Sequence, residues 1–240
     1  MLERLQNILS HAGVASRRHS ALIIEGGRVK VDGVTVTQPG ERFDPSCVKI
    51  TVDGKPLAAA EKTRTIMMYK PMGVLSSMSD PFGGTTVADV LSGQISERLV
   101  PVGRLDKDSE GLLLMSNDGD LTLRLTHPRY EHEKIYMVRA AGRWSDDKLE
   151  TLRSSLVING YKIRPCKVDL LRVGRDNVHL LKFHLREGRK RQIRYMCSAA
   201  HLVVVNLKRV QIGSLRLDES LKPGEWRDLT PAELVMLTRQ

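Results

Sequence analysis

One carboxylate of this chain stands in a segment whose residue types suit catalysis. Residues 103–114 read Gly-Arg-Leu-Asp-Lys-Asp-Ser-Glu-Gly-Leu-Leu-Leu, and Asp106 is the aspartate that follows Gly-Arg-Leu. The polar half predicts an irregular loop and the apolar end a buried strand, a common setting for catalytic residues. Asp106 has the chemistry of a nucleophile, a general base or a metal ligand, and a helix cap or a turn is the structural alternative.

A run of cations forms the second chemical feature. Residues 186–194 read Arg-Glu-Gly-Arg-Lys-Arg-Gln-Ile-Arg, so five of these nine side chains are basic. The run joins a predicted strand over 178–185 to a predicted helix over 191–200, and Gly188 permits close approach of another backbone. Such a run either binds phosphates or forms the solvated start of a helix.

Composition places this chemistry in a basic globular protein. The 240 residues carry 38 Lys and Arg against 28 Asp and Glu, which leaves a net charge of +10, and the pI is about 9.7. Clustered positive charge at such a pI favours a nucleic-acid partner over charge that only maintains solubility. The hydrophobic content of 41% excludes a chain that is disordered throughout.

The sequence lacks the signals of several other protein classes. No apolar run approaches the roughly 18 residues of a membrane span, and the N-terminus lacks the apolar core of a secretory signal. We therefore expect a cytoplasmic protein with no membrane association. The three cysteines form no Cys-x-x-Cys pair and the seven histidines no metal-ligand spacing, so no metal site is predicted.

Periodicity in residues 1–57 predicts a small domain of two helices and a short curled sheet. Apolar residues follow helical spacing over 2–12, and Ser16 is a candidate N-cap for a second helix that ends at Gly26 and Gly27. Asp-Gly pairs at 32–33 and 53–54, set between alternating apolar residues, predict hairpins. Residues 58–64 are rich in alanine and charge without apolar periodicity, and we expect them to form a linker.

The patterns over 65–240 predict an α+β domain. Strands are expected over 66–69, 112–115, 135–140, 178–185 and 202–205, and helices over 86–91, 120–125 and 191–200, with Asp120 as the cap of the second. Strands and helices alternate irregularly, without repeated βαβ units. This order argues against a doubly wound parallel sheet.

The first domain resembles the ribosomal-protein-S-four-type RNA-binding domain, also called the alpha-L motif. The resemblance rests on the run over 4–18 and on Gly-Gly-Arg-Val-Lys-Val-Asp-Gly at 26–33. It implies cations that contact RNA phosphates without reading bases, namely Arg4, Arg17, Arg18, Arg28 and Lys30. A solvated helix face is the alternative. The two adjacent arginines in the first turn of a helix, where the dipole disfavours cations, favour an RNA contact.

The chain as a whole resembles the RsuA-like ribosomal-RNA pseudouridine synthases, which join an alpha-L domain to a pseudouridine synthase domain. The main motifs are Lys-Pro-x-Gly at 70–73, Gly-Arg-Leu-Asp with Gly-Leu-Leu-Leu at 103–114, Lys-x-Tyr-x-Val at 134–138 and Arg-Glu-Gly-x-x-Arg-Gln-Ile-Arg-x-Met at 186–196. Ser109 and Tyr195 replace a common threonine and a frequent arginine without removing a required chemical group. The resemblance implies a mixed, mainly antiparallel sheet flanked by helices.

The same resemblance implies roles for particular residues. Asp106 is the essential carboxylate, Arg194 the arginine that pairs with it and keeps it ionised, and Tyr136 the tyrosine that stacks on the target uracil. Leu185 packs beneath the base. The remaining substrate contacts are Lys70, Arg104 and Arg191.

The implied reaction isomerises a uridine of ribosomal RNA to pseudouridine. The glycosidic bond breaks, the uracil rotates and carbon 5 joins the sugar, after the nucleotide has left the base stack. This chemistry is redox-neutral, and no cofactor is predicted. Nucleophilic attack and elimination both remain open for Asp106. The implied partner is ribosomal RNA or a partly assembled ribosomal subunit, and a monomer is expected.

Two other classes of protein compete with this interpretation. A non-catalytic RNA-binding factor for ribosome assembly fits the charge and the first domain alone. A metal-dependent RNA phosphodiesterase would hold Mg²⁺ with the clustered carboxylates Asp106, Asp108, Asp118 and Asp120. The synthase motifs around Asp106 and Arg194 favour the isomerase over both.

Overall fold

The computed structural model describes residues 1–59 and 62–238, which form two compact units. The first is built on Met1–Thr63 with Ser96–Arg98, and the second on the rest of the described chain. Residues 60 and 61 of the predicted linker lie outside the described residues. The exact bounds of the two domains and the linker stay predictions.

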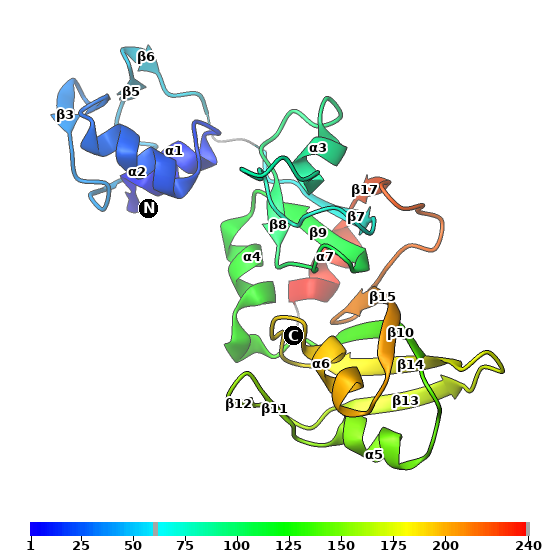
Figure 1. Cartoon of the computed structure of the whole chain (residues 1–240). Coiled ribbons are helices and arrows are strands. Elements are labelled where there is room, and N and C mark those ends of the chain that lie inside the picture. Colours follow the sequence, from blue (N-terminus) through cyan, green and yellow to red (C-terminus); the bar gives the residue numbers. More distant parts are fainter. Residues whose placement is uncertain (60–61, 239–240) are drawn as a thin grey trace. The chain divides into compact units, whose positions relative to one another are not determined.

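The N-terminal unit packs two helices onto a small sheet with the strand order β3-β2-β5-β6 (Figure 1). Ser16 caps the second helix, because its Oγ accepts a hydrogen bond of 3.2 Å from the His19 N–H. The first helix starts later than its apolar spacing predicts, since Glu3 and Arg4 pair with a neighbouring strand. The elements are β1 (Glu3–Arg4), α1 (Leu5–His11), α2 (Arg17–Glu25), β2 (Val29–Val31), β3 (Val34–Val36), β4 (Arg42–Phe43), β5 (Ile50–Val52) and β6 (Lys55–Pro56).

The second unit is organised around one large sheet (Figure 1). Its strands follow the order β13-β14-β10-β15-β9-β7-β17, with β16 beside β15 and β8 beside β9. Among the described pairs only β15 with β9 is parallel. The strands are β7 (Thr65–Lys70), β8 (Val100–Val102), β9 (Glu110–Ser116), β10 (Lys134–Ala141), β13 (Lys167–Arg172), β14 (Val178–Leu185), β15 (Val203–Ile212), β16 (Leu215–Arg216) and β17 (Trp226–Asp228).

Helices cover both faces of the sheet where β7 and β9 run. Alternate residues of these strands enter two separate cores, one with α4 and α7 and the other with α3. Both strands therefore consist almost entirely of buried residues. A third core joins β10, β13 and β14 to α5 and α6. The helices are α3 (Val87–Leu91), α4 (Gly119–Thr126), a short 3-10 turn (Pro128–Tyr130), α5 (Asp147–Arg153), α6 (Gln192–Ala199) and α7 (Pro231–Thr238), and a separate hairpin joins β11 (Val157–Ile158) to β12 (Tyr161–Lys162).

The α+β class and the mainly antiparallel sheet are confirmed, and several local predictions are corrected. Asp118, not Asp120, caps α4, because its Oδ1 accepts hydrogen bonds of 2.9 Å from the N–H groups of Asp120 and Leu121. The strand expected over 202–205 is only the start of β15, which continues to Ile212. The sequence patterns did not predict α5, α7, β8, β13 or β17. These elements are too short, or contain too few apolar residues, for a period to be recognised.

Candidate active site

Four segments that are distant in the sequence meet around one cavity of about 700 Å³ in the second unit. The loop over 103–109 joins β8 to β9 and carries Asp106, while Tyr136 comes from β10 and Leu185 from the end of β14. The start of α6 contributes Arg191 and Arg194. Arg104 completes the set, so six of the predicted site residues line the same cavity.

The loop that carries Asp106 is fixed to neighbouring elements by several hydrogen bonds. Ser76 Oγ donates to the Leu105 carbonyl at 2.9 Å, and the Leu105 N–H donates back to the same Oγ at 3.0 Å. The Lys107 carbonyl accepts from the Gly73 N–H at 2.7 Å. A turn closes from the Ser109 N–H to the Asp106 carbonyl at 3.1 Å. A catalytic group held in this way needs little reorganisation.

The Asp106 carboxylate is not held by these contacts. It is half-buried and lines the cavity, and within residues 1–59 and 62–238 it has no hydrogen-bond or ion-pair partner. Its backbone is positioned by the turn while its side chain stays available. A carboxylate in this state has its oxygens free for a substrate atom.

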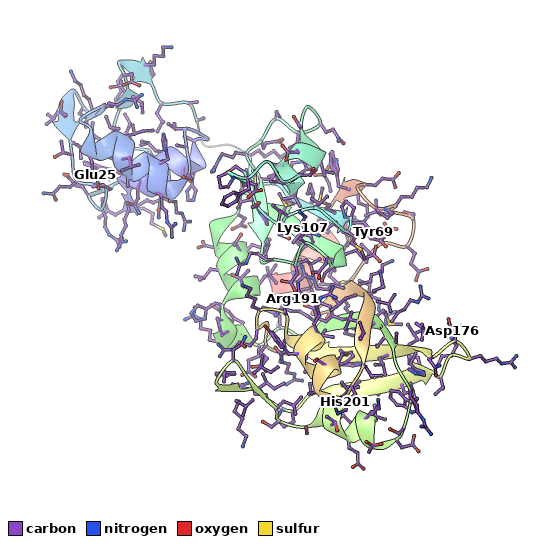
Figure 2. The ribbon with its side chains drawn as sticks, viewed as in Figure 1. Glu25, Tyr69, Lys107, Asp176, Arg191 and His201 are labelled. Atoms are coloured by element: carbon purple, nitrogen blue, oxygen red, sulfur yellow. The ribbon has the colours of Figure 1, made fainter. Side chains whose placement is uncertain are left out.

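Arg194 binds Asp108 rather than Asp106, which corrects the expected pairing. Its Nη2 donates to the Asp108 carbonyl at 2.7 Å, and its Nε lies 3.3 Å from Asp108 Oδ2. Arg191 Nη1 lies 3.0 Å from the same oxygen. Figure 2 labels Arg191 within the second unit. The turn over 106–109 directs Asp108 toward α6, so both arginines fasten the loop two residues beyond Asp106.

Lys70 does not contact the cavity, which corrects its predicted role as a substrate contact. Its side chain is fully buried at the end of β7, and Nζ donates to the carbonyls of Ser109 at 2.7 Å and Pro71 at 2.9 Å. Burial lowers the pKa of Lys70 to about 8, although Asp108, Asp106 and Glu110 partly oppose that shift. Lys70 therefore supports the loop from beneath.

Tyr136 and Leu185 form an apolar wall of the cavity. The strand register places Tyr136 beside Phe183 of β14 on one side and Arg209 of β15 on the other. Tyr136 is 9% exposed and Leu185 is 3% exposed, yet both reach the cavity surface. An aromatic face and an aliphatic side chain at one surface suit a flat, uncharged base.

Several cavity residues were not singled out from the sequence. Leu75, Ser76 and Ser77 follow the Lys-Pro-x-Gly motif and form one side of the cavity. Arg189 also lines it, and its guanidinium lies 3.4 Å from the ring centroid of Tyr161 on β12. The basic run contained the signal for Arg189, whereas nothing in the spacing of small polar residues marked Ser76.

The five predicted RNA-binding cations lie on the surface of the N-terminal unit, and all are exposed. Arg28 is paired with Asp53, its Nε lying 2.9 Å from Oδ1, so part of its charge is already compensated. Arg17 and Arg18 open α2 with no acidic residue in its first turn. Among the described residues, neither arginine is paired with a carboxylate as Arg28 is.

The carboxylates of the phosphodiesterase alternative do not assemble into a metal site. Asp118 is occupied in capping α4, and Asp108 is bound to two arginines. Throughout the described ranges, no three side chains of His, Cys, Asp or Glu are grouped as metal ligands. No helix among the described residues has the length and apolar content needed to cross a membrane.

Comparison with known proteins identifies the family. The family described as RNA pseudouridylate synthase matches residues 64–199, and the S4 domain matches residues 3–46. The chain belongs to the RNA pseudouridylate synthase family. It is a pseudouridine synthase of the RsuA-like type, with an RNA-binding domain at its N-terminal side.

Characterised and uncharacterised synthases resemble the chain over nearly its full length. The ribosomal large subunit pseudouridine synthase B of Bacillus subtilis is 37% identical over 237 residues, 98% of this chain and 96% of that protein. An uncharacterized RNA pseudouridine synthase of Aquifex aeolicus is 37% identical over 235 residues, 98% of this chain and 93% of its own length. A crystal structure of a pseudouridylate synthase superposes with a TM-score of 0.70 at 29% identity, covering 98% of this chain and 99% of the other.

Proposed function

We propose that this synthase isomerises a specific uridine of ribosomal RNA to pseudouridine, with Asp106 as the essential carboxylate. The observation that carries the proposal is the cavity itself, where five other predicted site residues surround the Asp106 carboxylate, which has no partner among the described residues. The relative from Bacillus subtilis, named ribosomal large subunit pseudouridine synthase B, supports the choice of substrate.

The target nucleotide enters the cavity after leaving its base stack, at a cost of about a few kcal/mol. Tyr136 stacks on the uracil and Leu185 packs beneath it, which offsets part of that cost. Arg104 and Arg191 contact the phosphates of the flipped nucleotide. The fixed loop holds Asp106 against the sugar.

The reaction exchanges one bond of the sugar for another. The bond from C1′ to N1 breaks and a bond from C1′ to C5 forms, while C5 loses its proton and N1 gains one. Asp106 either attacks C1′ or removes a proton from the sugar, and both routes need the ionised carboxylate. Arg194 acts as a positioning residue through Asp108.

Nucleoside analysis of treated RNA tests this function. Transcripts of large- and small-subunit ribosomal RNA, which carry no modification, are incubated with the full chain and digested, and pseudouridine is quantified by mass spectrometry. We expect pseudouridine in one of the two RNAs, and the large-subunit transcript is the first to test because of the named Bacillus subtilis relative. Absence from both transcripts and from immature subunits would favour the non-catalytic assembly factor.

A further inference from the structure

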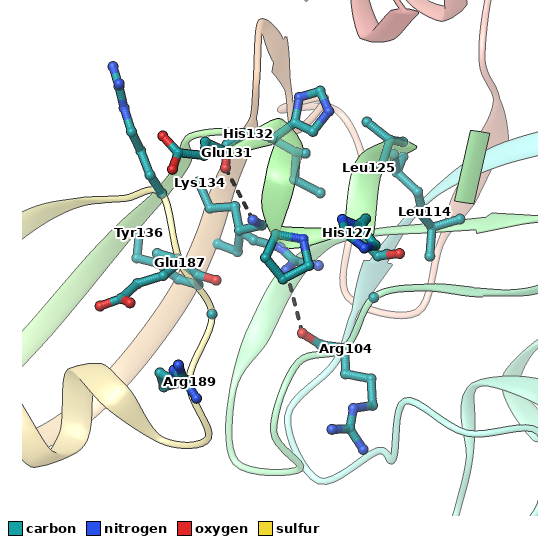
Figure 3. Close-up of a pocket in the computed structure, with 18 of the residues that line it drawn as sticks. Arg104, Leu114, Leu125, His127, Glu131, His132, Lys134, Tyr136, Glu187 and Arg189 are labelled. Atoms are coloured by element: carbon teal, nitrogen blue, oxygen red, sulfur yellow. Dashed lines mark hydrogen bonds between the residues drawn. The ribbon is translucent and has the colours of Figure 1, made fainter. Parts of the chain in front are cut away.

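A second pocket adjoins the candidate active site (Figure 3). It encloses about 400 Å³, and its wall shares Gly103, Arg104, Tyr136, Gly188 and Arg189 with the cavity of Asp106. Because the two spaces have these residues in common, a strand of RNA whose target nucleotide fills the first can extend into the second. The mechanism above leaves this second pocket without a role.

Two cations near Tyr136 line this pocket, the half-buried Lys134 and the buried Arg209. Lys134 and Tyr136 are two residues apart on β10 and so share one face of the sheet. Arg209 on β15 is the register partner of Tyr136 and is only 3% exposed. Figure 3 shows Lys134 turned into the pocket, whereas the side chain of Arg104 points away from it.

The protein leaves part of this positive charge unpaired. Lys134 Nζ donates to the His132 carbonyl at 3.1 Å, and Arg209 Nε donates to the Leu112 carbonyl at 2.8 Å. Arg209 Nη2 is buried and has no hydrogen-bond partner among the described residues. Within the described residues, neither Lys134 nor Arg209 has a carboxylate within ion-pair distance.

The two glutamates of the pocket are already engaged elsewhere. Glu131 pairs with the guanidinium of Arg164. Glu187 accepts hydrogen bonds from Gln192 Nε2 at 2.9 Å and from the Arg164 N–H at 3.1 Å. Apart from Arg104, the lining carries five cationic side chains against these two carboxylates. The field inside the pocket therefore favours an anion.

Burying unpaired charge is unfavourable, and the two cations show its effect. Burial, together with the nearby charge of Arg209, lowers the pKa of Lys134 to about 8. An unsatisfied buried donor such as Arg209 Nη2 also carries a desolvation cost. A phosphodiester brings a permanent negative charge and two unesterified oxygens, one for each of these two cationic donors.

We propose that the Lys134–Arg209 pocket binds a phosphodiester of the substrate RNA next to the target uridine, with Lys134 Nζ and Arg209 Nη2 as its donors. The proposal rests on the proposed function, since it takes RNA as the substrate. Free inorganic phosphate offers the same chemistry, so the test has to separate the two sources.

The test measures how RNA binding by the full chain depends on salt. Lys134→Met removes one donor, Lys134→Arg keeps the charge, and Arg139→Met is the matched control, because Arg139 is an exposed cation on the same strand but at an odd offset from Tyr136. We expect Lys134→Met to weaken binding about ten-fold and to reduce the slope of log affinity against log salt by about 0.7 to 0.9. Lys134→Arg and Arg139→Met should keep the wild-type slope.

Further outcomes separate the proposal from its alternatives. A wild-type slope for Lys134→Met would overturn the phosphodiester site, even where the wild type forms pseudouridine. If inorganic phosphate stabilises the wild type more than Lys134→Met while the RNA slope is the same for both, the pocket is a free-anion site and the proposal is wrong. A wild type that forms no pseudouridine contradicts the proposed function instead, and the slope comparison still decides the phosphate contact.

Discussion

Replacing Arg194 with alanine should cut turnover strongly while replacing Asp108 with alanine should not. Arg194 makes two contacts with the Asp106 loop, a hydrogen bond of 2.7 Å to the Asp108 carbonyl and an ion pair of 3.3 Å to its side chain. Arg194→Ala removes both contacts. Asp108→Ala keeps the carbonyl and removes only the side-chain contacts, which are the ion pairs with Arg194 and Arg191.

The two contacts differ in the free energy that they contribute. A hydrogen bond from a charged donor contributes about 1.5 to 3 kcal/mol, which corresponds to roughly ten- to a hundred-fold in rate if the bond holds the loop in its reactive position. The Asp108 side chain is 43% exposed, so its ion pairs with Arg194 and Arg191 together contribute about 1 kcal/mol, or roughly five-fold in rate. Arg194→Ala should therefore be the more damaging variant by about an order of magnitude.

Single-turnover kinetics with saturating RNA measure this difference without a contribution from binding. We expect the loss to appear in the rate constant, with the affinity for RNA changed far less, and Arg194→Lys to recover part of it. Circular dichroism and thermal unfolding control for misfolding. Equal rates for Arg194→Ala and the wild type would refute the positioning role, and equal losses in Arg194→Ala and Asp108→Ala would refute the assignment to the carbonyl.

Two further predictions concern RNA affinity and stability. Arg17→Ala should weaken RNA binding and lower its salt slope by about 1 without changing the single-turnover rate, and an unchanged slope would count against Arg17 as a phosphate contact. Lys70→Met should remove a pH dependence of stability. In the wild type, the pKa of Lys70 is about 8 in the folded chain and takes the ordinary value of 10.5 in the unfolded chain, so the unfolded chain binds more protons between these two pH values. The unfolding free energy of the wild type therefore rises by about 3 kcal/mol across this range. Denaturant titrations of both proteins at the two ends of this range measure the effect, and equal rises would contradict the burial of a charged Lys70.

The fold class and the position of the site could be predicted from sequence because both depend on local patterns. Ser16 before a helical stripe and the Asp-Gly turns carry their structure in a few neighbouring residues. The motif around Asp106 and the run over 186–194 are likewise continuous in the chain. Their meeting around one cavity depends on strand order, which periodicity does not give. The resemblance implied only that these residues share a site.

The partners of individual side chains could not be predicted in this way. Asp106 and Asp108 are carboxylates two residues apart in one turn, and only the path of that turn directs Asp108 toward Arg194. Lys70 precedes a Pro-x-Gly loop and has the sequence setting of an exposed residue. The register of β7 with β9 sets it opposite Gly111, beneath the loop, where burial decides its role.

Two predictions from the sequence concern the cellular location of the protein and its oligomeric state. A cytoplasmic location and a monomer remain expectations from the sequence.

Tritium release from ribosomal RNA labelled at uracil C5 tests the central claim most directly. C5 loses its hydrogen only when it becomes the new glycosidic carbon, so release reports the isomerisation itself. Asp106→Asn keeps the size of the side chain and removes its charge, and Asp120→Asn makes the same change at the first turn of α4, outside the cavity. The account predicts release by the wild type and Asp120→Asn and none by Asp106→Asn. Release by Asp106→Asn at the wild-type rate would contradict it.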